Sequence, residues 1–128
     1  MILVDAGVLI DFLRTKDAKL DRLFRTEPVA VCGATRAEIL AGARNPQDRQ
    51  RLMQFLGTFQ QVGTPEPLWD LAGETLATLY ARGITVPFPD ALVTTIAIEN
   101  DIEVWARDPH FRIMQTALSR LKLYSEPP

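Results

Sequence analysis

The first five residues constrain the fold more than any other stretch of this sequence. Met1-Ile2-Leu3-Val4 is an apolar run without polar alternation, and it stops at the carboxylate of Asp5. Such a run is typical of a strand buried on both faces, as in the centre of a parallel sheet. The next apolar residues have the spacing of one helix face: Val8, Leu9, Phe12 and Leu13. Asp5 is therefore expected where a central strand joins a helix, at the edge where open parallel sheets bind ligands.

Short apolar runs alternate with helical patterns along the rest of the chain. Further strands are predicted at 29–32, 60–62, 102–107 and 121–124. Further helices are predicted at 17–25, 35–44, 47–59, 65–83, 90–100 and from 109 onward. This alternation indicates an α/β fold with a mainly parallel sheet flanked by helices. A chain of 128 residues is expected to form one domain, residues 1–128, around one core.

The composition excludes several classes of protein. Hydrophobic residues make up 47% of the chain and charged residues 23%, which is ordinary for a globular protein and excludes disorder. No window reaches the roughly 18 apolar residues of a membrane span, and no basic region marks a signal peptide. The single cysteine, Cys32, cannot form an internal disulfide. We therefore expect a cytoplasmic protein without a membrane association.

Four acidic residues lie at predicted boundaries between strands and helices: Asp5, Glu38, Asp90 and Asp108. In a parallel sheet, these positions converge on one edge. Carboxylates gathered within a few ångströms raise one another's pKa unless a cation neutralises them. Oxygen ligands without a cluster of histidine or cysteine favour Mg²⁺ or Mn²⁺ over zinc, and such a site suits phosphoryl chemistry. The net charge is −2 when all acids are counted. If these four acids bind a metal, the rest of the chain is mildly basic, which is compatible with a polyanionic substrate.

Each of these acids also has a structural interpretation. Asp90 and Asp108 fit the N-cap position of a helix, where aspartate is common. Thr35-Arg36-Ala37-Glu38 matches a capping box, in which the glutamate bonds to the backbone of the cap residue. Asp5 is harder to explain in this way, because a carboxylate that ends a buried strand needs a cation or several donors.

Two further features of the sequence are interpreted as structural. His110 is the only histidine, and we interpret it as a turn residue beside Pro109 rather than as a catalytic base. Five basic residues of the first helices could contact the phosphates of a polyanionic substrate: Arg14, Lys16, Lys19, Arg22 and Arg25. Because Asp17 and Asp21 lie among them, a solvated helix face of mixed charge is the preferred interpretation.

Four short motifs span essentially the whole chain. They are Val4-Asp5-Ala6-Gly7-Val8-Leu9-Ile10-Asp11, Thr35-Arg36-Ala37-Glu38-Ile39-Leu40-Ala41-Gly42, Pro89-Asp90-Ala91-Leu92-Val93 and Arg107-Asp108-Pro109-His110-Phe111. As an ordered set, they resemble the PIN-domain ribonucleases, and above all the toxin component of VapBC-type toxin–antitoxin pairs. The resemblance implies a PIN-like domain over 1–128, in which the four acids bind Mg²⁺ or Mn²⁺. It also implies that a metal-activated water cleaves RNA.

The same resemblance implies several partners. An RNA substrate, a cognate antitoxin protein that occupies the acidic groove, and a second copy of the chain in a homodimer are all expected. The apolar residues of the first two helices are interpreted mainly as core: Phe12, Leu13, Leu20, Leu23 and Phe24. In the resembled toxins this region helps to form the antitoxin groove, so we expect part of it to be an exposed partner surface.

The sequence departs from the family pattern at two positions. The family usually has a hydroxyl residue two positions after the first aspartate and another two before the last, where this chain has Gly7 and Ala106. Both changes remove hydrogen bonds that tune metal affinity. The alternative function is therefore a non-catalytic PIN-like protein-binding module with a weakened acidic site. A phosphoacceptor domain or an Asp-x-Asp phosphatase is disfavoured, because Ala6 and Gly7 follow Asp5 where those proteins carry a second acid.

Overall fold

A four-stranded parallel sheet lies at the centre of the computed structural model, which describes residues 1–128. Its strands are β1 (Ile2–Val4), β2 (Val29–Cys32), β3 (Gln60–Val62) and β4 (Glu103–Trp105). Their spatial order is β3-β2-β1-β4, and every neighbouring pair is parallel. The prediction of an α/β fold with a central first strand is therefore confirmed.

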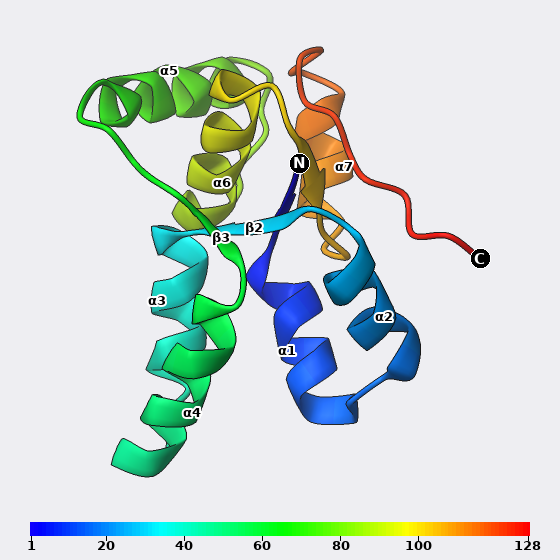
Figure 1. Ribbon diagram of the computed structural model, residues 1–128. Coiled ribbons are helices and arrows are strands. Elements are labelled where there is room, and N and C mark those ends of the chain that lie inside the picture. Colours follow the sequence, from blue (N-terminus) through cyan, green and yellow to red (C-terminus); the bar gives the residue numbers. More distant parts are fainter.

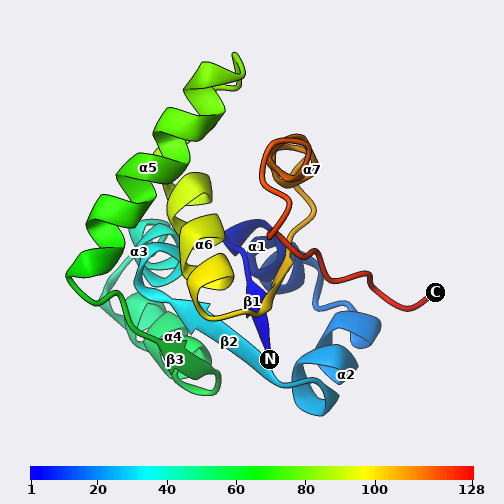
Figure 2. The ribbon, with the colours of Figure 1, turned by 90° about the horizontal axis from the view of Figure 1, so that it is seen from above.

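Seven helices cover the two faces of this sheet (Figure 1). They are α1 (Ala6–Thr15), α2 (Ala18–Thr26), α3 (Gly33–Ala41), α4 (Pro46–Gly57), α5 (Pro67–Ala81), α6 (Phe88–Glu99) and α7 (His110–Gln115). Figure 1 shows α5, α6 and α7 on one side of the strands, with α1, α2 and α4 on the other. Figure 2 views the molecule from above, from the side of α5, α6 and α7. None of these helices has the length and apolar character that crossing a membrane requires.

Alternate residues of the strands contribute to two separate cores. Leu3 packs with α5, α6 and α7, whereas Ile2 and Val4 pack with α1, α2 and α4. β4 follows the same rule, since Val104 belongs to the first core and Trp105 to the second. The central strands are buried on both faces, and this explains why their sequences are apolar without alternation.

Several predicted element boundaries are wrong. Helix α3 begins at Gly33 with Cys32 as its N-cap, so Thr35 lies inside the first turn and cannot cap it. Helix α6 begins at Phe88 rather than at Asp90, because Pro89 is readily accommodated in a first turn that needs no N–H from it. The predicted capping box and the predicted N-cap role of Asp90 are therefore both incorrect. In contrast, Asp17 caps α2 as predicted, with its Oδ1 accepting the Leu20 N–H at 3.0 Å.

The last predicted strand is reduced to a single bridge. Leu123 pairs with Val104 alone, through hydrogen bonds of 2.8 Å that flank it on either side. The chain then turns away, and Glu126 accepts hydrogen bonds from Trp105 Nε1 at 3.0 Å and from the Arg107 guanidinium at 2.8 Å. These side-chain contacts hold the carboxyl-terminal segment in place of a fifth strand.

Candidate metal centre

The four acids predicted from the sequence belong to four different segments near the carboxyl edge of the sheet. Asp5 directly follows β1, and its backbone N–H donates to the Trp105 carbonyl of β4 at 2.9 Å. Asp108 lies three residues beyond β4, and Glu38 lies in α3, the helix that follows β2. Asp90 lies in the first turn of α6. We call Asp5, Glu38, Asp90 and Asp108 the acidic cluster.

Asp5 is a buried carboxylate that does not act as a structural cap. It occupies the N-cap position of α1 but makes no side-chain capping hydrogen bond, and it is only 6% exposed. Burial and the charge of Asp90 raise the pKa of Asp5 to about 6, although the backbone N–H groups of Ala6 and Gly7 lower it in part. Glu38 makes a smaller contribution that raises this pKa further. The fold therefore places Asp5 where its ionised form lacks a positive partner.

Asp90 links the other acids to Asp5. It is 9% exposed, and its buried Oδ2 atom has no hydrogen-bond partner. Burial and the nearby charge of Asp108 raise the pKa of Asp90, whereas the adjacent His110 lowers it. Burial and the charge of Asp90 also raise the pKa of Glu38, which is otherwise exposed to solvent. The four carboxylates thus form one electrostatically connected group.

His110 lies against two acids of the acidic cluster, where the sequence interpretation did not place it. It is the first residue of α7, and its Nδ1 atom lies 2.8 Å from Oδ1 of Asp108 and 3.2 Å from Oδ2 of Asp90. The ligand atoms of these three residues all lie within 4.8 Å of one another. The available signal was its position two residues after an aspartate at a helix start, in a chain with one histidine. Asp5 and Glu38 lie outside this tighter group of three.

The residues present fit a divalent cation. Burial and the charge of Asp90 raise the pKa of Asp5, which has no positive partner, and the buried Oδ2 atom of Asp90 has no hydrogen-bond partner. A divalent ion would supply both missing interactions. The donor atoms are mainly carboxylate oxygens, which suit Mg²⁺ or Mn²⁺.

The helix-capping roles that the sequence suggests for Asp108 and Glu38 can be compared with the structure. Asp108 is not the N-cap of α7, which is Pro109, but its Oδ1 accepts the backbone N–H of His110, the first residue of that helix, at 2.8 Å. Glu38 has no capping role, since α3 begins two residues before Thr35.

Beside Asp5, a Cβ atom built on Gly7 would lie 3.8 Å from Oδ2 of Asp5, which is an ordinary contact distance. A side chain at position 7 would therefore fit without a clash, and glycine is not required there to avoid one.

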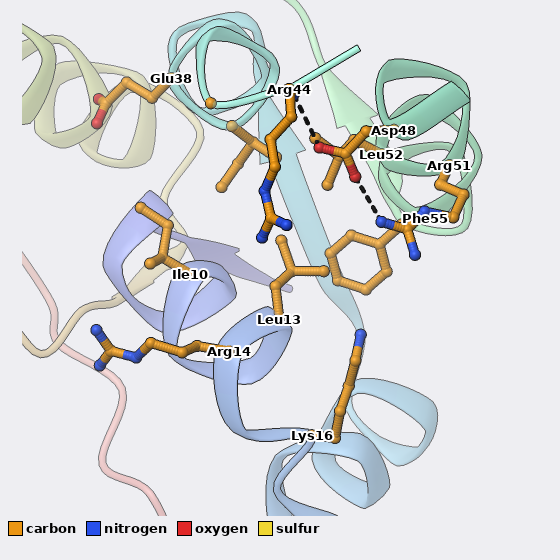
Figure 3. Close-up of a pocket in the computed structure, with 12 residues that line it drawn as sticks. Ile10, Leu13, Arg14, Lys16, Glu38, Arg44, Asp48, Arg51, Leu52 and Phe55 are labelled. Carbon is orange, nitrogen blue, oxygen red and sulfur yellow. Dashed lines mark hydrogen bonds and ion pairs between the residues drawn. The ribbon is translucent and has the colours of Figure 1, made fainter. Parts of the chain in front are cut away.

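A groove of about 680 Å³ lies between α1, α3 and α4, with Glu38 of the acidic cluster among the residues that line it (Figure 3). Its apolar side chains come from three helices: Ile10, Leu13, Ile39, Leu52 and Phe55. Four basic side chains surround these: Arg14, Lys16, Arg44 and Arg51. Asp48 accepts hydrogen bonds from the Arg51 guanidinium and the Arg44 backbone N–H, as the dashed lines in Figure 3 mark. We call this the α1/α3/α4 groove.

Comparison with known proteins gives one family and several structural neighbours. A family model described as the PIN domain matches residues 2–116. VapBC2 from Rickettsia felis, bound to a DNA fragment from the promoter, is 15% identical with a TM-score of 0.81, over 97% of this chain and 98% of that one. DNA-bound VapBC from Salmonella typhimurium is 14% identical with a TM-score of 0.80, over 96% of each chain.

A third neighbour is VapC20 from Mycobacterium tuberculosis, which is described as a sarcin-ricin loop cleaving toxin. It is 16% identical with a TM-score of 0.73, over 99% of this chain and 100% of that one. At such identities, these likenesses establish a shared fold. No curated protein sequence matches the chain.

Proposed function

Since this chain belongs to the PIN domain family, we propose that it is a metal-dependent endoribonuclease and the toxin of a VapBC-type toxin–antitoxin pair. The observation that carries the proposal is the acidic cluster, in which the buried Oδ2 of Asp90 has no hydrogen-bond partner. Burial and the charge of Asp108 raise the pKa of Asp90, and the charge of Asp90 in turn raises the pKa of Asp5 and of Glu38. Such a site is stable with all its charges only when a cation is bound.

The four acids have distinct roles in this proposal. Asp5, Asp90 and Asp108 would hold Mg²⁺ or Mn²⁺ with help from Glu38. When bound, the ion would supply Lewis-acid chemistry, which activates water and stabilises charge on a phosphodiester. Asp5 and Asp90 are fixed by buried backbone, so they are organised before any ligand arrives. Glu38 is solvent-exposed, and burial and the charge of Asp90 raise its pKa, which suits a carboxylate that accepts a proton from water.

RNA is the substrate class that the family supports best, and the neighbour that is described as cleaving the sarcin-ricin loop supports the same class. The antitoxin partner is supported by the neighbours solved as VapBC complexes. The α1/α3/α4 groove, apolar in its centre and open to one of the cluster's carboxylates, is the surface that we assign to this partner. We extend the proposal to a homodimer and a cytoplasmic location on the strength of the family resemblance.

A second function is favoured by one observation. Gly7 and Ala106 provide no hydroxyl near the acidic cluster, and Asp5 has no hydrogen bond from any side chain. A PIN-like module that binds an antitoxin-like protein without cleaving RNA is consistent with such a weakened site.

One experiment separates the two functions. Untagged protein is incubated with total RNA in Mn²⁺, in Mg²⁺ or in excess chelator, beside the variants Asp90→Asn and Asp70→Asn. Asp70 is an exposed aspartate in the first turn of α5, and it is not among the residues that shift the pKa of Asp5, Glu38 or Asp90, so its variant is the matched control. We expect metal-dependent cleavage by the wild type and by Asp70→Asn, with none by Asp90→Asn. Cleavage that persists in chelator contradicts the metal-dependent nuclease proposal, and correctly folded wild type that cleaves no RNA with either metal favours the binding module.

A further inference from the structure

We propose that His110 binds the metal ion directly through Nδ1, and that this nitrogen makes the site prefer Mn²⁺ to Mg²⁺. The inference rests on the proposed function, because it requires an ion at the acidic cluster. It goes beyond that function by adding a nitrogen ligand to a set that the sequence motifs describe as acids only.

The spacing of the donor atoms is the first argument. Nδ1 of His110 lies 2.8 Å from Oδ1 of Asp108 and 3.2 Å from Oδ2 of Asp90. Neighbouring ligands of an octahedral ion with bonds of about 2.1 Å lie roughly 3 Å apart. The nitrogen and the two oxygens are therefore already separated like adjacent ligands around one ion, and all three atoms fall within 4.8 Å.

The lack of hydrogen bonds within this group is the second argument. Nδ1 of His110 and Oδ2 of Asp90 are both buried, yet neither has a hydrogen-bond partner of acceptable geometry. The two atoms are close to each other, but the geometry between them does not suit a hydrogen bond. Buried polar atoms that lack hydrogen-bond partners are uncommon in folded proteins, and a bound ion is one explanation for them. An ion between the atoms would satisfy both of them.

The fold holds the imidazole in this position. The backbone N–H of His110 donates to Oδ1 of Asp108 at 2.8 Å, which fixes the start of α7 against the aspartate. The next residue, Phe111, is 1% exposed and belongs to the core beneath α6 and α7. Burial of the Phe111 ring together with this hydrogen bond holds the backbone of His110 beside the carboxylates.

The chemistry of the donor set determines the metal preference. Mg²⁺ is a hard ion that takes oxygen ligands and retains water, whereas transition metals bind imidazole nitrogen well. Two carboxylates and one imidazole therefore favour Mn²⁺ over Mg²⁺ relative to a set of carboxylates alone. Removing the imidazole should weaken Mn²⁺ binding selectively, and removing a carboxylate should weaken the binding of both ions.

Pulsed electron paramagnetic resonance of bound Mn²⁺ tests this inference directly. His110 is the only histidine in the chain, so an imidazole ¹⁴N coupling in untagged protein can come from no other side chain. We expect this coupling in the wild type and its loss in His110→Gln. In parallel titrations, His110→Gln should lose about tenfold or more in Mn²⁺ affinity with little change for Mg²⁺. Asp90→Asn, the comparison variant, should weaken the binding of both ions.

Each other outcome has a definite meaning. Mn²⁺ bound without ¹⁴N coupling, or equal losses of both ions in His110→Gln, overturns the inference and leaves the nuclease proposal standing. An absence of Mn²⁺ binding by the correctly folded wild type overturns the inference together with the metal dependence of the proposed function. Circular dichroism of each variant establishes that the fold is retained, and His110→Asn provides a second substitution if His110→Gln unfolds.

Discussion

After burial itself, the carboxylate of Asp90 is the strongest cause that raises the pKa of Asp5, to about 6. The two residues are far apart in sequence, one after β1 and the other in the first turn of α6. Folding thus brings together two buried like charges and provides no basic side chain between Asp5 and Asp90. An arrangement that costs folding free energy in the absence of a ligand is typical of a functional site.

The first prediction is that Asp5→Asn stabilises the protein in chelator at pH 7. A carboxyl whose pKa is raised on folding binds more protons in the folded state, so its contribution to stability falls as pH rises from about 4 to about 6. A shift of two units corresponds to up to about 3 kcal/mol. Denaturant unfolding should therefore show a gain of about 1–3 kcal/mol for Asp5→Asn at pH 7 that vanishes near pH 4.

Asp17 provides the contrast for this measurement. Its side chain caps α2, and asparagine caps a helix as well as aspartate does. Asp17→Asn should therefore change stability by no more than about 0.5 kcal/mol at either pH. A loss of stability in Asp5→Asn at pH 7 would mean that Asp5 is a structural residue.

The second prediction concerns the hydroxyl that position 7 lacks. A Cβ on Gly7 meets only Oδ2 of Asp5, at 3.8 Å, so a serine side chain fits and its hydroxyl can approach the carboxylate. Gly7→Ser should tighten Mn²⁺ binding by up to about tenfold, because an added hydrogen bond favours the ionised Asp5. Gly7→Ala should leave metal affinity unchanged and raise stability by about 1 kcal/mol, since alanine favours a helix over glycine. Equal metal affinities in the two variants would contradict this role for the hydroxyl.

The sequence was sufficient to predict those elements that depend on local patterns. The apolar run before Asp5 predicts a central strand because only a strand with two covered faces lacks alternation, and β1 is central. Asp17 was predicted as a cap because the signal is contained within one turn. The four motifs predicted the family, because their order and spacing are specific as a set.

Features that depend on tertiary packing could not be predicted in this way. Thr35 has the pattern of a helix cap, but it is fully buried and α3 begins two residues earlier. The segment 121–124 has the composition of a strand, but the contacts of Glu126 with Trp105 and Arg107 direct the chain away after one bridge. His110 was interpreted as a turn residue, because its proximity to Asp90 arises only when α6 and α7 pack together.

The third prediction is that Glu38→Gln lowers RNA cleavage without lowering stability. Glu38 takes part in no capping box, and burial and Asp90 raise its pKa, so removing its charge relieves repulsion. We expect the melting temperature in chelator to stay within about 2 °C, because an exposed polar substitution changes stability little. Cleavage in Mn²⁺ should fall at least about tenfold. A clear fall in melting temperature with normal cleavage would show that Glu38 has a structural role.

The fourth prediction is that Ile10→Glu prevents antitoxin binding and spares RNA cleavage. Ile10 lines the α1/α3/α4 groove and is 45% exposed, so a charge there should cost little folding free energy. An apolar helix face laid into this groove would bury Ile10, and a buried unpaired carboxylate would oppose that contact. The measurements are titration with the cognate antitoxin and its inhibition of RNA cleavage.

Met53→Glu is the matched control for the groove, because Met53 is 42% exposed on α4 but does not line it. Both variants carry the same new charge, so a general effect of charge on association should appear equally in each. We expect Met53→Glu to be inhibited like the wild type, and Ile10→Glu to escape inhibition with at least about a tenfold loss of affinity. If the two variants bind the partner equally well, the antitoxin contacts another surface, and the groove must be reassigned while the nuclease centre stands.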